Sequence, residues 1–181
     1  MVPAADVGNA DDRYGRTPEW FLASKDRDVH VARVGVIAER AVDLLHLLAD
    51  QLDPVVDLVI ESLRDGVKWS GELLALPDVR EAVGRLRLLL AMYGGVEITI
   101  VTADDQLTLT PELELAIYSR TDRWLFLLDG LGIVERASAP RAVWRLDRGA
   151  LAPIGPLTEA LEDAADRLCL EASPLLPVRA L

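Results

Sequence analysis

The clearest pattern along the chain is a two-residue alternation of apolar and polar side chains on both sides of short turns. Residues 57–74 alternate in this way around Asp65-Gly66, a pair that suits a two-residue type I′ turn because both of its central positions need positive φ. The resulting register sets Ser62 opposite Trp69 and gathers the apolar side chains on one face. We therefore predict a β-hairpin whose buried face is anchored by Trp69.

Further alternating segments extend this pattern. Residues 96–110 predict a hairpin in which a four-residue turn beginning at Ala103 sets Ile100 opposite Leu109, and residues 112–128 predict a third hairpin. Alternation of this kind is typical of antiparallel strands with one covered face. The remaining predicted strands are 133–137 and 142–146.

Apolar residues at spacings of three and four predict three amphipathic helices, at 31–52, 78–93 and 157–171. In the second helix, Asp78 and Glu81 have the spacing of a capping box. Helices and hairpins alternate along the chain, which favours an α+β fold. We expect an antiparallel β-sheet built from successive hairpins, with about three helices packed on it.

The chain of 181 residues is long enough to bury one substantial core, so a single domain is expected. Residues 1–18 are small and polar with several prolines and glycines, which is typical of a flexible N-terminal arm. We place the α+β domain at 19–181.

Residues 110–146 also admit a helical interpretation. Thr110-Pro111 suits a helix start, Thr121 can cap a second helix, and 133–146 then resembles the wing of a winged-helix domain. Six arginines and four carboxylates between 120 and 148 give this part of the chain a local positive charge. The resemblance implies a DNA-binding transcriptional regulator. Its candidate basic patch is Arg120, Arg123, Arg141 and Arg145.

The overall charge favours other classes of partner. A formal net charge of −11 argues against a large nucleic-acid footprint and against attraction to anionic membranes. No uncharged run approaches the roughly 18 residues of a transmembrane helix. The first residues carry aspartates where a signal peptide would be apolar, and the single cysteine cannot form an internal disulfide. We expect a cytoplasmic protein.

Few residues suggest chemistry. His46 is flanked by carboxylates on the polar side of its helix, and we interpret it as part of a solvated face. Cys169 lies among acidic residues, which do not favour a reactive thiol, and Asp104-Asp105 is typical of a turn. The chain contains no catalytic or phosphate-binding motif that we recognise. We therefore expect no enzymatic activity, no cofactor and no metal.

These observations favour a non-enzymatic, acidic, cytoplasmic protein-binding module of the inhibitor, immunity, chaperone or adaptor type. An acidic surface steers basic partners toward it, so we expect a basic protein partner. The alternatives are a homodimer, a winged-helix regulator and an enzyme whose site is built from scattered Asp, Arg and Tyr residues. Toxin-neutralising immunity proteins and secretion chaperones include small acidic α+β proteins of this kind. The candidate partner-binding residues lie on the outer face of the last predicted helix: Glu159, Glu162, Asp163 and Asp166.

Overall fold

A computed structural model of the chain describes residues 19–140 and 146–175. The predicted N-terminal arm at 1–18 and most of the predicted strand at 142–146 lie outside the described residues. The description below refers to the described ranges.

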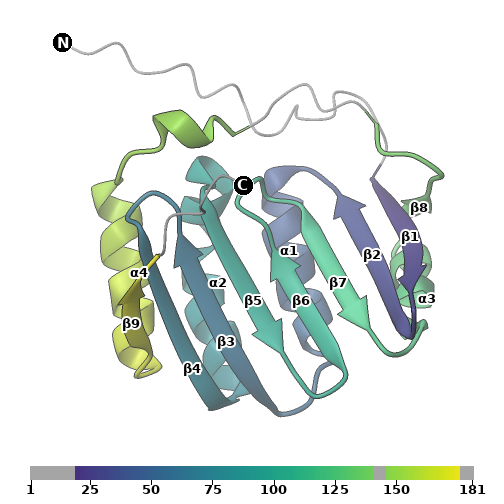
Figure 1. Cartoon of the computed structure of the whole chain (residues 1–181), viewed down its shortest axis with the longest axis horizontal. Helices are drawn as coiled ribbons and strands as arrows, with labels where there is room; N and C mark the ends of the chain where they lie inside the picture. Colours follow the sequence, from purple (N-terminus) through teal and green to yellow (C-terminus); the bar gives the residue numbers. More distant parts are fainter. Residues whose placement is uncertain (1–18, 141–145, 176–181) are drawn as a thin grey trace.

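The described strands form one sheet in the order β8-β1-β2-β7-β6-β5-β3-β4-β9 (Figure 1). Neighbouring strands are antiparallel, except that β1 pairs with β8 in parallel. Successive hairpins therefore build most of the sheet, as predicted. The strands are β1 (Trp20–Asp26), β2 (Val29–Gly35), β3 (Val55–Ser62), β4 (Val67–Ala75), β5 (Val96–Val101), β6 (Asp105–Leu109), β7 (Leu115–Ser119), β8 (Val134–Glu135) and β9 (Glu171–Pro174).

Helices cover one face of this sheet. Figure 1 shows α1 and α2 behind the sheet; α2 also contacts α4, while α3 lies beside β8 at the other edge. None of the described helices is both long and apolar enough to cross a membrane. The arrangement confirms the predicted α+β class. The helices are α1 (Ala38–Ala49), α2 (Leu76–Tyr93), α3 (Arg123–Gly130) and α4 (Gly155–Arg167), with a short 3₁₀ turn, η2 (Arg148–Ala150).

The hydrophobic core lies between the sheet and its helices. Strand side chains point alternately to the two faces, so Leu58 and Ile60 of β3 are buried while Val59 between them lies on the opposite face and is half-buried. From the helix side, Leu44 and Leu48 of α1 are buried against the sheet layer. The opposite face of the sheet carries no helix among the described residues (Figure 1).

The register predicted for the β3–β4 hairpin is wrong by two residues. Ser62 pairs with Val67, not with Trp69, and the turn contains four residues. The shift is even, so every side chain of the hairpin core keeps its predicted face. Tertiary contacts favour the longer turn, because the carboxylate of Asp65 accepts hydrogen bonds from the hydroxyls of Ser62 (2.6 Å) and of Thr158 in α4 (2.7 Å).

The β5–β6 hairpin is displaced in the same way. Ile100 pairs with Leu107 instead of Leu109, and the chain turns between Thr102 and Asp105, where the backbone N–H of Thr102 donates to the Asp105 carbonyl (2.8 Å). Asp105 was predicted to lie in the turn but begins β6, because its carboxylate is buried in the protein. Again the buried face is the predicted one.

The predicted helix at 31–52 is wrong in its first part. Residues 29–35 form β2, which pairs with β1 on one side and with β7 on the other, and the helix begins only at Ala38. Ala32 and Val34 fit a strand as well as a helix stripe, so periodicity alone could not separate the two. Strand β1 was not predicted.

The two later helices have ends that differ from the prediction. Helix α2 begins at Leu76 without a side-chain cap, so the capping box of Asp78 and Glu81 is wrong; Pro77 occupies the first turn instead. Helix α4 ends at Arg167, four residues earlier than predicted.

Residues 110–146 combine parts of both interpretations. The strand predicted around Ile117 is confirmed as β7, which lies inside the sheet between β2 and β6, so a helix beginning at Thr110 is wrong. The strand predicted through Trp124 and Leu128 is also wrong: these residues form the buried side of α3, as the helical interpretation held. Their spacing of four suits one face of a helix.

Candidate functional site

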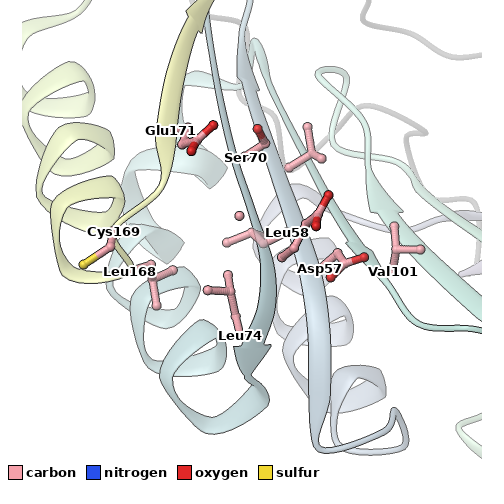
Figure 2. A pocket seen from close by; sticks show the side chains of 11 residues that line it. Asp57, Leu58, Ser70, Leu74, Val101, Leu168, Cys169 and Glu171 are labelled. Carbon is pink, nitrogen blue, oxygen red and sulfur yellow. The ribbon is translucent and has the colours of Figure 1, made fainter.

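A groove of about 700 Å³ lies where β3, β4 and β5 meet β9 and the end of α4. In Figure 2, Leu74 and Leu168 lie opposite one another at one end, while Ser70 and Glu171 lie at the other. Three half-buried aliphatic side chains give the groove its accessible apolar surface: Val59, Leu74 and Val101. Leu58 and Leu168 also border it but are buried.

The groove forms where β4 extends beyond β9, the strand that pairs with it at the edge of the sheet. β9 pairs only with Val67–Ser70, so the second half of β4 has no strand on that side among the described residues. A bulge opposite Asp57 pushes Leu73 outward, where it is 81% exposed with φ of +54°. The carboxylate of Asp57 accepts the backbone N–H of Leu73 (2.9 Å), which holds the bulge in place.

The end of α4 forms the other wall. Cys169 adopts φ of +53°, its N–H donates to the Asp166 carbonyl (3.2 Å), and the N–H of Leu170 donates to the Ala165 carbonyl (2.9 Å). This is the Schellman arrangement, in which glycine is the usual left-handed residue. It reverses the chain into β9 and sets Leu170 over Gly71, where an added Cβ would lie 2.6 Å from the leucine.

Three carboxylates give the groove its charge: Asp57, Glu72 and Glu171. No ion pair joins any of them to a basic side chain in the described ranges. Carboxylates beside exposed aliphatic surface suit a ligand with a cationic head and an apolar stem. The exposed thiol of Cys169 does not contribute, because its sulfur points away from the groove (Figure 2).

The predicted partner-binding residues line the outer face of α4, whose last residues lead into the groove. Glu159, Glu162 and Asp166 are exposed, and Asp163 is exposed but accepts a hydrogen bond from Arg167 (2.7 Å). This hydrogen bond raises the pKa of the Arg167 guanidinium. Three of the four predicted carboxylates therefore lack an ion-pair partner among the described residues.

A smaller cavity of about 230 Å³ lies between α2 and α4. Two of its charged residues pair with each other: Arg85 donates to Glu81 (2.6 Å) and thereby lowers the pKa of that carboxyl. Leu168 lines this cavity and the groove, so both belong to the same corner of the molecule.

The structure describes two of the four residues of the predicted basic patch, Arg120 and Arg123. Arg120 forms an ion pair with Asp104 (3.7 Å), and Arg123 pairs with Asp105 (2.5 Å) while its guanidinium stacks on Trp124 at 4.8 Å from the ring centre. The other two members, Arg141 and Arg145, lie outside the described residues. The DNA-binding alternative therefore stays a prediction.

Asp105 is a structural centre that sequence reasoning missed. Its buried carboxylate accepts hydrogen bonds from the Ser119 hydroxyl (2.5 Å), the Trp124 indole N–H (2.8 Å) and the Arg123 guanidinium. These contacts fasten α3 to β6 and β7. The sequence carries no signal for this role, because its partners are 14 to 19 residues away.

His46 does not lie on a solvated face. It is half-buried between α1 and α2, where its Nε2 accepts a hydrogen bond from Arg80 of α2 (3.1 Å). The flanking carboxylates pair with α2 arginines instead, Asp50 with Arg80 and Asp43 with Arg87. These groups join the two helices.

A second acidic group lies on the helix-free face of the sheet. The β3–β5 register sets Glu61 beside Glu97, and Glu61 also pairs with Lys68 (3.3 Å). Partial burial, followed by the charge of Glu61, raises the pKa of Glu97. Within the described ranges, no three acidic, histidine or cysteine side chains are arranged to hold a metal ion.

Comparison with known proteins adds no relative. No protein-family model matches the chain, and neither the curated proteins nor the solved structures give a significant match.

Proposed function

We propose that this protein is a non-enzymatic, acidic protein-binding module that holds a basic protein partner at the corner formed by β4, β9 and α4. One observation carries the proposal: unpaired carboxylates line a groove that also has aliphatic surface, and further unpaired carboxylates are exposed on the outer face of the helix that leads into it. A cationic partner would neutralise these charges and cover the apolar surface at the same time.

The net charge of the whole molecule also favours a basic partner. A net charge of −11 attracts basic proteins over long distances and repels acidic ones, which raises the association rate with the former. The apolar part of the groove then supplies short-range affinity, since buried aliphatic area contributes about 25 cal/mol per Å².

The test compares the capture of the partner by two charge-reversal variants that differ only in where the reversed charges lie. The tagged protein is expressed in its native host, and the lysate is treated with nuclease before purification. Replacing Glu159, Glu162 and Asp166 by lysine should lower the affinity for a co-purifying basic protein at least about tenfold, because each reversed charge turns an attraction into a repulsion.

The matched control reverses three exposed carboxylates at the opposite edge of the sheet: Asp28, Asp129 and Glu135. Both variants change the net charge by the same amount, so only the position differs. Partner retained by the control and lost by the α4 variant supports the proposal. Equal retention by both variants contradicts it, and so does the absence of any protein partner together with binding of DNA fragments when the nuclease is omitted.

A further inference from the structure

We propose that the groove seats an extended segment of the basic partner, with an arginine or lysine side chain laid across the aliphatic floor. This inference rests on the proposed function, because it describes how that partner is held. It adds the conformation and the residue types of the partner segment.

The floor of the groove matches the two-part character of a long cationic side chain. Val59 and Val101 are half-buried on the helix-free face of the sheet, and Val101 pairs with Asp57 of the neighbouring strand. An arginine stem can lie on the two valines while its guanidinium reaches the carboxylate of Asp57. A purely apolar segment would bury the carboxylate without supplying a positive charge to pair with it.

The negative charge of the groove favours a cationic segment over a second copy of this chain. Asp57, Glu72 and Glu171 come from three strands and line the same groove, and none is paired with a basic side chain in the described ranges. A second copy of this chain brings a further net charge of −11 to the interface, which opposes self-association. A cationic segment is favoured at the same place.

The edge of the sheet favours an extended segment. β9 ends its pairing at Ser70, so backbone groups of β4 beyond this residue face the groove without a strand partner among the described residues. An extended peptide can add to such an edge through main-chain hydrogen bonds, and its alternate side chains then point into the groove. A helical segment could not form these bonds.

The probe is the peptide acetyl-Arg-Val-Arg-Val-Arg-amide, titrated into the full-length protein and followed through backbone amide NMR shifts. We expect saturable shifts at Ser70, Gly71, Leu74 and Val101. The same peptide with citrulline in place of arginine keeps the shape and loses the charge, so its affinity should be at least about tenfold lower.

The protein variant is D57N/E72Q/E171Q, which keeps the acceptor oxygen that holds Leu73 and removes three charges. It should lower the affinity for the arginine peptide about tenfold. Glu171 is exposed on β9, so E171Q alone gives a milder variant with the native fold and a smaller loss of affinity.

The control variant D28N/D129N/E135Q removes the same number of charges at the opposite edge of the sheet and should bind the peptide as the unaltered protein does. Equal weakening by the control would show that net charge alone acts and would overturn the inference.

Other occupants give different results. Equal binding of the citrulline peptide, or no shift at all with the arginine peptide, overturns the inference. Shifts at the same amides on raising the protein concentration alone would identify a second copy, and spermine binding as tightly as the peptide would identify a free polyamine; either result also overturns it.

The two proposals fail separately. If the peptide does not bind but the captured partner is still lost from the α4 lysine variant, the groove inference is wrong and the proposed function stands. If the α4 variant and the groove variant both keep the partner, the proposed function is wrong.

Discussion

At the scale of single residues, two of the four described non-glycine residues with positive φ border the proposed site. Leu73 comes directly before the lining residue Leu74, and Cys169 follows the end of α4. An L-residue in this conformation costs about 1 kcal/mol relative to glycine, so the surrounding hydrogen bonds must hold it there.

We predict that Cys169→Gly raises the free energy of unfolding by about 1 kcal/mol, because glycine adopts the left-handed C-terminal position of α4 without strain. Urea denaturation measures the change. Cys169→Ala keeps the Cβ and should give no such gain. A glycine variant no more stable than the alanine variant would contradict the strained arrangement.

Asp105 contributes to stability through the buried hydrogen bonds that its carboxylate accepts. Asp105→Ala should lower the free energy of unfolding by about 3 kcal/mol, because it leaves the buried Trp124 N–H and Ser119 hydroxyl without their acceptor. Arg123 is partly exposed, so its lost ion pair adds little. Asp105→Asn keeps one acceptor oxygen and should cost less. Equal losses for both variants in urea denaturation would show that the hydrogen bonds are not the cause.

Glu97 should make stability depend on pH. Its pKa is raised above the ordinary 4.5 in the folded protein, so the folded state binds the proton more tightly than the unfolded state. Stability therefore falls as pH rises from about 4.5 through the raised value. Glu97→Gln should be more stable than the parent at pH 7, by less than about 1 kcal/mol, and this gain should vanish below pH 4.5. A gain independent of pH would contradict the assignment.

At the scale of secondary structure, the sequence predicted which face the β3–β4 and β5–β6 hairpins bury and missed their register. Alternation determines the face, and a shift of two residues leaves it unchanged, so the pattern around Trp69 is equally satisfied by both registers. The deciding contacts are distant in sequence: Thr158 for the first hairpin, Ser119 and Trp124 for the second. Sequence spacing contains no information about them.

The site was predicted in part. The acidic face of α4 follows directly from helical spacing. The groove required the bulge opposite Asp57, the early end of α4 at Arg167 and the short pairing of β9. None of these has a sequence signal, because the left-handed residues are Leu73 and Cys169, where a glycine would have been recognised. Carboxylates from three separate strands then meet by topology alone.

Strand β1 offers a test of the unpredicted part of the sheet. Gly35 of β2 lies against the indole of buried Trp20, and an added Cβ would be 2.3 Å from it. Gly35→Ala should therefore displace Trp20, lower the free energy of unfolding by about 2 kcal/mol and speed hydrogen exchange in β1 more than in β5. An alanine variant with unchanged exchange in β1 would show that the two residues are not in contact.

At the scale of the whole molecule, different parts of the fold form the core and the accessible surfaces. Helices α1 and α2 and the buried face of the sheet form the core, while the opposite face and the β4–α4 corner stay accessible (Figure 1). Unpaired carboxylates line that corner, whereas Arg80 and Arg123 form ion pairs that join separate elements of the fold. The packed core therefore carries a corner with unpaired negative charge.

The most direct test of the partner-binding account is hydrogen exchange of this protein with and without the captured partner. The account predicts slower exchange in α4, β9 and the second half of β4, with β1, β8 and α3 unchanged. Protection confined to the β1–β8–α3 edge, or absent throughout, would contradict it.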